Sequence, residues 1–152
     1  MRKIPQLDDL THYKTWLLVG RVDAKCQHLL TLGLRELGLS VAKYEVLHAI
    51  YRDEGLSQQS LARRLLVAKS NVTVLSQRLE ADALIRREHD PEDGRGYCVF
   101  LTDTGQEIVE QAVQLHAEVV ELMAKGLTRR QAEMLDQIMS RAEGNLDLAL
   151  SR

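Results

Sequence analysis

The apolar residues recur at helical spacing along most of the chain, which predicts a mainly helical fold. A first long helix is predicted over residues 8–35, where apolar residues three or four positions apart are Val19, Val22, Cys26 and Leu29. Ser40 is a suitable N-cap for a second helix over 41–52, because its hydroxyl can accept a hydrogen bond from a free N–H of the first turn. Ser57 has the same role in a short third helix that ends near Leu66.

An extended pattern interrupts the helices. The segments "ALIRREHD" (83–90) and "GYCVFLT" (96–102) have the composition of strands. The connection between them, "PEDGRG", combines Pro, Asp and Gly, which is a strong turn signal. The sequence therefore predicts a two-stranded hairpin.

Two long helices are predicted after the hairpin. The fifth helix spans about 103–125 and is closed by Gly126. The sixth runs to about residue 148, and Thr128 as N-cap with Gln131 three residues later forms a capping box at its start. The apolar side of the sixth helix contains Met134, Leu135, Ile138 and Met139.

The length and composition are those of one compact domain. The chain has 152 residues, of which 45% are hydrophobic and 28% charged, so a single domain over 1–152 is expected. Two cysteines without a ligand or redox spacing favour a reduced setting. No apolar run is long enough for a secretory signal or a membrane span. We therefore expect a cytoplasmic protein with no membrane partner.

The net charge of −2 hides an uneven distribution. Residues 55–79 contain no acid and include the bases Arg63, Arg64, Lys69 and Arg78. The predicted helix over 103–125 carries five acids and one base: Asp103, Glu107, Glu110, Glu118, Glu121 and Lys125. Such asymmetry places a positive face on an acidic protein.

A fourth helix is predicted over about 69–81, and its two sides differ. At 100° per residue, Val72, Leu75 and Leu79 share one side. The other side presents Ser70, Thr73, Val74 and Gln77, flanked by Lys69, Asn71 and Arg78. Amides and hydroxyls can bond base edges in a DNA major groove, and the flanking cations can neutralise phosphates. The alternative for a lone helix is an ordinary solvated face.

The preceding helix favours the DNA interpretation. Leu61, Ala62 and Leu65, with Val67 in the turn, have the apolar spacing of a helix-turn-helix when combined with Val72 and Leu75. Ala62 is small where the two helices must approach closely. The hairpin that follows makes the predicted unit a winged helix-turn-helix.

These segments, in this order, resemble the MarR family of bacterial transcription regulators over nearly the whole chain. "LGLSVAKYEVLHAI" is similar to the start of the family's second helix, and "LARRLLVAKSNVTVLSQRLEADALIRR" to its helix-turn-helix and first wing strand. "DPEDGRGYCVFLTDTG" is similar to the family wing, Asp-x-x-Asp-x-Arg through Leu-Thr-x-x-Gly. The resemblance implies a mainly α fold with a small β-wing. It comprises a winged helix-turn-helix core (about 40–102) and dimerisation helices (about 8–35 and 103–150).

The resemblance also implies the DNA contacts. It places Ser70, Asn71, Thr73 and Gln77 in the major groove and Arg95, at the tip of the wing, in a minor groove, with Asp93 bracing the wing. The family's homodimer would bind double-stranded DNA at a pseudo-palindromic operator, with half-sites about one helical turn apart.

Several positions depart from the family pattern. Leu66 stands in the helix-turn-helix turn and Ala83 before the first wing strand, and glycine is common at both places in the family. Glu92 occupies a wing position that is often basic, and Gly94 adds flexibility to the wing tip.

The resemblance further implies an effector, because family members change DNA affinity on binding small, frequently aromatic acids or on thiol oxidation. His12, Tyr13 and Trp16 are candidates to line a ligand cavity, which Tyr44 and His48 would join; core and interface packing is the alternative for each. The stretch that carries a reactive cysteine in thiol sensors holds Trp16 here. Cys26 is expected to be buried and inert, and nothing in the sequence activates Cys98.

Three functions compete at this point. The first is a dimeric DNA-binding repressor that a small ligand releases, with a thiol-based redox regulator as a variant. The second is a winged-helix protein-interaction module, against which the acid-free segment 55–79 argues. The third is an enzyme, for which the sequence contains no phosphate-binding loop, GxSxG or paired carboxylates. No cofactor or metal site is expected, because the histidines have no ligand spacing.

Overall fold

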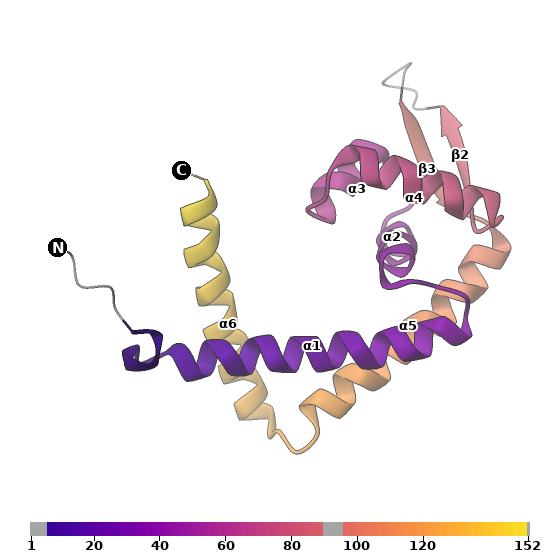
Figure 1. Cartoon of the computed structure of the whole chain (residues 1–152). Helices are drawn as coiled ribbons and strands as arrows, with labels where there is room; N and C mark the ends of the chain where they lie inside the picture. Colours follow the sequence, from indigo (N-terminus) through magenta and orange to yellow (C-terminus); the bar gives the residue numbers. More distant parts are fainter. Residues whose placement is uncertain (1–5, 90–95, 152) are drawn as a thin grey trace. The chain divides into compact units, whose positions relative to one another are not determined.

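The computed structural model describes residues 6–89 and 96–151, and these are mainly helical (Figure 1). The chain contacts divide it into two compact units, Met1–Val119 and Val120–Arg152. The elements follow in the order η1 (Leu7–Asp9), α1 (Tyr13–Glu36), α2 (Val41–Arg52), β1 (Leu56–Ser57), α3 (Gln58–Arg64), α4 (Lys69–Ala81), β2 (Ile85–His89), β3 (Tyr97–Leu101), α5 (Asp103–Ala124) and α6 (Arg129–Leu150).

The predicted helix starts are confirmed where a side chain caps the first turn. The Ser40 hydroxyl accepts the Lys43 N–H at 3.2 Å at the start of α2, and α2 has the predicted bounds. The Ser57 hydroxyl accepts the Ser60 N–H at 3.2 Å at the start of α3. Thr128 and Gln131 form the expected capping box at the start of α6. Each cap satisfies a donor that the helix itself leaves free.

Two helix ends differ from the prediction. The first long helix begins at Tyr13, because residues 7–9 form a separate 3-10 turn in which the Leu10 N–H bonds the Leu7 carbonyl at 3.0 Å. The third helix ends at Arg64 instead of about Leu66. Leu66 has φ +53°, and this left-handed backbone cannot continue an α-helix.

The predicted hairpin is present as β2 and β3, which pair antiparallel from Ile85 opposite Leu101 to His89 opposite Tyr97. A third strand was not predicted: β1 pairs antiparallel with β3, with Leu56 opposite Val99. The sheet order is β1-β3-β2. Two residues are too few for an alternating pattern, so β1 is recognisable only from its pairing with β3.

One apolar core holds the first unit together. It is built mainly from α2, α3, α4 and the sheet, and its largest fully buried side chains include Tyr44, Leu34, Leu47, Ile50, Leu61, Leu79 and Ile85. In Figure 1, α2 lies between α1 and the α3–α4 pair, and it has contacts with all three helices. The core therefore fixes α4 and the sheet as one body.

The apolar positions of α1 are divided between core and surface. Leu30 and Leu34 are buried, whereas Val19, Val22 and Leu29 are more than two-fifths exposed. Cys26 is half-buried, so the expectation of a buried thiol is wrong for the single chain. Cys26 lies on α1 between exposed Val22 and buried Leu30.

In the second unit, α6 leaves its apolar side uncovered. Met134, Leu135, Ile138 and Met139 are each at least 40% exposed, and no described residue of α6 is buried. Across residues 6–89 and 96–151, no helix has the length and apolar character that crossing a membrane requires.

Candidate nucleic-acid interface

Helices α3 and α4 pack as a helix-turn-helix. Leu61, Ala62 and Val72 are buried between them, and Leu65 and Leu75 pack against the same core. The turn is closed by the Val67 N–H, which donates to the Ala62 carbonyl at 3.1 Å. The apolar residues that predicted this motif are therefore buried or packed against the core, as expected.

The exposed face of α4 carries the polar residues that the sequence placed there. Lys69, Ser70, Asn71, Val74, Gln77 and Arg78 are exposed, while Val72, Ser76 and Leu79 are buried. Ala68 at the N-cap offers no side-chain acceptor to the first turn of α4. Uncapped N–H groups and the positive end of a helix dipole favour an anion such as a DNA phosphate.

Thr73 differs from the other predicted contacts, because it is half-buried at the edge of this face. Its hydroxyl donates to the Lys69 carbonyl of its own helix at 3.0 Å and lies 3.4 Å from Oε1 of Gln58 on α3. Thr73 is therefore tied to the scaffold as well as placed beside the exposed face.

The first two acids after the acid-free segment are paired with bases. Glu80, the first acid after the acid-free segment, forms an ion pair with Arg87 of β2, and hydrogen bonding to Glu80 raises the pKa of Arg87. Asp82 forms an ion pair with Lys43. These contacts reduce the repulsion that either carboxylate would exert on a nearby phosphate.

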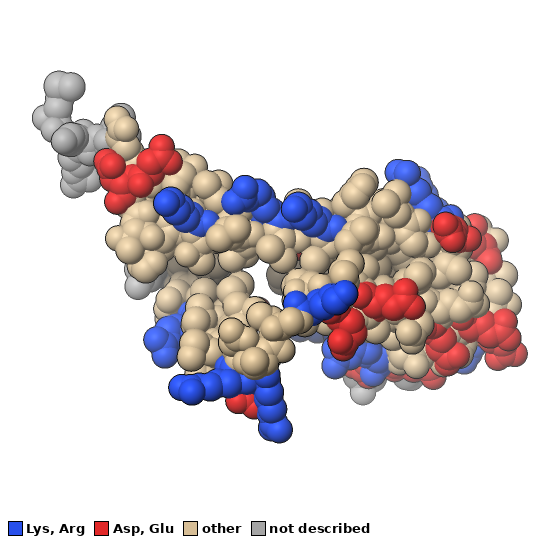
Figure 2. All heavy atoms as spheres, turned by 90° about the horizontal axis from the view of Figure 1, so that it is seen from below, with Lys and Arg blue, Asp and Glu red and all other residues tan. Residues whose placement is uncertain are grey.

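Acidic side chains gather elsewhere on the first unit. In the view from below, they lie over the end of the molecule where α5 begins (Figure 2), and α4 lies above that end in Figure 1. Asp103, Glu107 and Glu110 of α5 are exposed. The start of α5 is therefore acidic, whereas the exposed face of α4 contains no acid.

The two wing strands carry aromatic and basic side chains in contact. The Arg86 guanidinium lies 4.5 Å from the centre of the Phe100 ring, and that of Arg87 lies 5.3 Å from the centre of the Tyr97 ring. His89 stacks on Tyr97 with ring centres 4.9 Å apart. Cation–π contacts of this kind stiffen the hairpin. Asp93 and Arg95, with Glu92 and Gly94, lie outside the described residues.

A compact junction joins the wing to α5. The Thr102 hydroxyl donates to the Ala83 carbonyl at 2.7 Å and accepts the Gly105 N–H at 3.0 Å. A Cβ atom at Gly105 would lie only 1.8 Å from the Leu84 carbonyl oxygen, so any other residue would have to displace backbone. This contact explains the Leu-Thr-x-x-Gly pattern in physical terms, which the sequence alone did not do.

The predicted ligand residues form two separate groups within the chain. His12, Tyr13 and Trp16 line a concavity of about 440 Å³ near the start of α1, together with Leu10 and Thr11. Tyr13 stacks on Trp16 with ring centres 6.0 Å apart, and Trp16 is 69% exposed. Tyr44 and His48 lie on α2, which packs near the other end of α1, so the structure does not bring the two groups together.

The second group includes a residue that sequence reasoning missed. The hydroxyl of buried Tyr44 is hydrogen-bonded to Nδ1 of His116 on α5 at 2.8 Å, and Tyr44 stacks on His48 with ring centres 5.5 Å apart. The two hydrogen-bonded residues are 72 positions apart, and no local pattern could have joined them.

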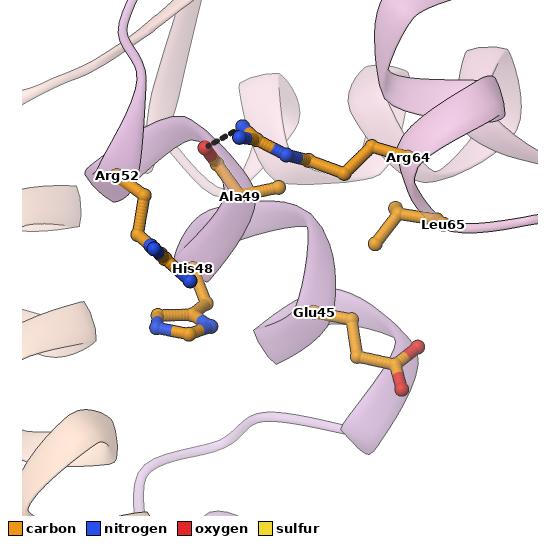
Figure 3. A pocket seen from close by; sticks show the side chains of 6 residues that line it. All are labelled: Glu45, His48, Ala49, Arg52, Arg64 and Leu65. Carbon is orange, nitrogen blue, oxygen red and sulfur yellow. Dashed lines mark hydrogen bonds between the residues drawn. The ribbon is translucent and has the colours of Figure 1, made fainter. Parts of the chain in front are cut away.

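His48 also lines a pocket of about 320 Å³ between α2 and α3, with Glu45, Ala49, Arg52, Arg64 and Leu65 (Figure 3). Arg64 reaches across this pocket and donates to the Ala49 carbonyl at 3.4 Å. Burial, followed by the charges of His116, Arg52 and Arg64, lowers the pKa of His48. Burial raises the pKa of Tyr44. The imidazole of His48 is therefore held toward its neutral form.

A helix-turn-helix with an exposed polar second helix, followed by a hairpin against the same core, defines a winged helix-turn-helix protein. Residues 37–96 match the model of the MarR family. The transcriptional regulator HosA of Escherichia coli O111:H- is 31% identical over 101 residues, which cover 66% of this chain and 75% of HosA. This chain belongs to the MarR family of transcriptional regulators, as the motif resemblance predicted.

Further relatives agree over a larger part of the chain. The transcriptional repressor IacR of Pseudomonas putida is 25% identical over 132 residues, covering 87% of this chain and 78% of IacR. The structure is similar to that of a mutant of MarR from E. coli complexed with operator DNA. The TM-score is 0.77 and the identity 27%, and the match covers 88% of this chain and 98% of the other. The similarity therefore extends beyond the helix-turn-helix to the long helices.

Proposed function

We propose that this protein is a homodimeric transcriptional repressor that binds a pseudo-palindromic DNA operator with α4 in the major groove. The observation that carries the proposal is the face of α4, which is exposed, polar and free of acids on a helix locked to the core by Val72 and Leu79. A relative named as a repressor and a similar MarR structure with operator DNA support it.

The α4 residues divide into base contacts and phosphate contacts. Asn71 and Gln77 are suited to adenine, Ser70 to either partner of a base pair, and the Val74 methyl groups to thymine. Lys69 and Arg78 lie at the margins, where they neutralise phosphates. Arg95 is proposed to enter a minor groove at the wing, with Asp93 bracing it.

Dimerisation is supported by apolar side chains that the single chain leaves exposed. They lie on α1 (Leu17, Leu18, Val19, Val22), on α6 (Met134, Leu135, Ile138, Met139) and at the end of α5 (Val120, Leu122, Met123). A soluble monomer rarely exposes so many large apolar residues, and a second copy of the chain would remove them from water.

Regulation by a small, frequently aromatic acid is part of the proposal, with two candidate places. One is the concavity of His12, Tyr13 and Trp16, which presents a stacked aromatic pair. The other is the pocket of His48, which lies beside Tyr44 and holds two arginines. A repressor of this kind acts in the cytoplasm, where its DNA lies, and performs no catalytic step.

The decisive experiment is selection of sheared genomic DNA by the purified protein at about physiological salt, where non-specific binding is weak. We expect enrichment of one two-fold symmetric motif. If the folded, dimeric protein enriches no motif, with or without aromatic acids, the DNA-binding proposal is wrong. The exposed face of α4 would then be tested as a protein-interaction surface.

A further inference from the structure

The Thr73 hydroxyl has more acceptors around it than it has hydrogens. The Lys69 carbonyl lies at 3.0 Å and Oε1 of Gln58 at 3.4 Å, but a hydroxyl donates one hydrogen only. The shorter contact to Lys69 is the usual bond of a threonine to the carbonyl one turn earlier. The hydrogen therefore serves Lys69, and the two oxygens of Thr73 and Gln58 face each other without a hydrogen between them.

Gln58 supplies the missing donor. Its side chain is only 9% exposed, and among the described residues its Nε2 has no hydrogen-bond partner. A half-turn about the last bond of the side chain exchanges the amide oxygen and nitrogen, which have almost the same shape. Nε2 then donates to the Thr73 oxygen, and Thr73 both donates to Lys69 and accepts from Gln58. One additional hydrogen bond forms in a buried place, where an unmade bond is costly.

We propose that Gln58 is a positioning residue for DNA recognition, which holds Thr73 with its oxygen available to DNA as an acceptor only. This inference rests on the proposed function. The hydroxyl hydrogen is used within α4, and Gln58 of α3 holds the oxygen from the scaffold side. The lone pair that remains at the edge of the exposed face can accept only from a base that donates.

The bases that Thr73 can recognise follow from its role as an acceptor only. In the major groove, adenine N6 and cytosine N4 carry amino donors, whereas guanine and the thymine carbonyl present acceptors. Thr73 should therefore favour adenine or cytosine at one position of each half-site. Without Gln58, the threonine side chain can turn to its other helical rotamer, and this preference should weaken.

The test compares the base preferences of five proteins on a library randomised over the selected half-site: wild type, Gln58→Met, Thr73→Val, the double variant and one control. The neighbouring Gln59→Met is the matched control, because Gln59 is exposed on the same turn. Gln58→Met should reduce the preference for adenine or cytosine at one position by about threefold to tenfold, the range for a single hydrogen bond. Thr73→Val should lose the preference at the same position. The double variant should lose no more, and Gln59→Met should match the wild type.

A purely structural role gives a different result. If Gln58→Met weakens binding to all sequences equally and leaves the preference at every position intact, the inference is wrong while the proposed function stands. If the wild type selects no symmetric motif, both are wrong. Should Gln58→Met fail to fold by circular dichroism, Gln58→Asn carries the same test, because its amide is one methylene too short to reach Thr73.

Discussion

Three helices of the first unit end in the same motif, and single residues decide how easily each adopts it. After α1, α3 and α4 the chain turns through a residue with positive φ: Gly38 at +69°, Leu66 at +53° and Ala83 at +57°. In each case the next N–H bonds a carbonyl five residues earlier, at distances between 2.9 and 3.1 Å. This is the Schellman motif, in which glycine avoids the clash of a Cβ atom. Leu66 and Ala83 are the two positions where the family pattern has glycine.

Replacing these two residues should therefore stabilise the protein. Leu66 is 92% exposed, so Leu66→Gly removes little packing, and Ala83→Gly removes one methyl group. We expect each to raise the free energy of unfolding by about 0.5–1 kcal/mol, because relief of left-handed strain exceeds the entropy cost of glycine. Urea unfolding measures the change. Ala117→Gly, at an exposed helical position of α5, should instead lower stability by about 1 kcal/mol. A loss of stability in all three variants would contradict the strain argument.

Ser76 is a further residue whose chemistry does not fit its place. It is fully buried on the core side of α4, and its hydroxyl has no hydrogen-bond partner among the described residues. Ser76→Ala removes this unpaired group, so the free energy of unfolding should rise by about 1 kcal/mol, with operator affinity unchanged. Chemical denaturation and a DNA titration check the two parts. Ser70→Ala, on the exposed face, should behave in the opposite way and affect DNA binding alone. A destabilised Ser76→Ala would show that the hydroxyl is paired in solution.

At the scale of elements, α2 is the connection between the helix-turn-helix and the long helices. Tyr44 of α2 is hydrogen-bonded to His116 of α5. Arg64 of α3 donates a hydrogen bond to the Ala49 carbonyl of α2. Its His48 lies between these two contacts and lines the pocket beside Arg52. A ligand that binds beside His48, or a proton that His48 takes up, therefore acts where α2, α3 and α5 meet.

The lowered pKa of His48 makes a pH prediction with a definite sign. In the folded protein, burial and the neighbouring cations favour the neutral imidazole, whereas the unfolded chain takes up the proton near pH 6.5. Stability should therefore be lost as pH falls through 6.5 toward the lower folded value. The thermal midpoint measured at pH 7.5 and 5.5 should fall less in His48→Gln than in the wild type. His28→Gln, on an exposed turn of α1, separates this effect from the loss of any histidine. If the thermal midpoint falls equally in all three proteins, His48 is not the source of the pH dependence.

At the scale of the whole molecule, the exposed apolar residues of α1 and α6 are the proposed dimer interface. Ile138 lies in the middle of the apolar side of α6 and is 56% exposed in the single chain. Ile138→Lys should shift sedimentation from dimer to monomer and weaken operator binding more than tenfold, because a monomer contacts one half-site only. Gln137→Lys, its exposed neighbour, should remain dimeric and bind normally. If Ile138→Lys still sediments as a dimer, this side of α6 is not the interface.

Local interactions account for what was predictable in the fold and the site. The bounds of α2 and α4, the caps of Ser40, Ser57 and Thr128, and the hairpin all depend on residues close together in sequence. The exposed and buried sides of α4 follow from helical periodicity, which needs no tertiary information. The family motifs belong to this local level, so the sequence by itself determined the class of protein. Arg95 and Asp93 were assigned in the same way and stay predictions.

Only the tertiary structure decided the features that depend on which elements meet. Pairing with β3 defines β1, and the approach of the Leu84 carbonyl makes Gly105 necessary. The contact of Gln58 with Thr73 and that of Tyr44 with His116 join different helices, and the division of α1 into exposed and buried apolar positions depends on where α2 packs. These contacts depend on distances between segments that periodicity and capping do not specify. A sequence pattern states what each side chain can do, but packing determines which partner it meets.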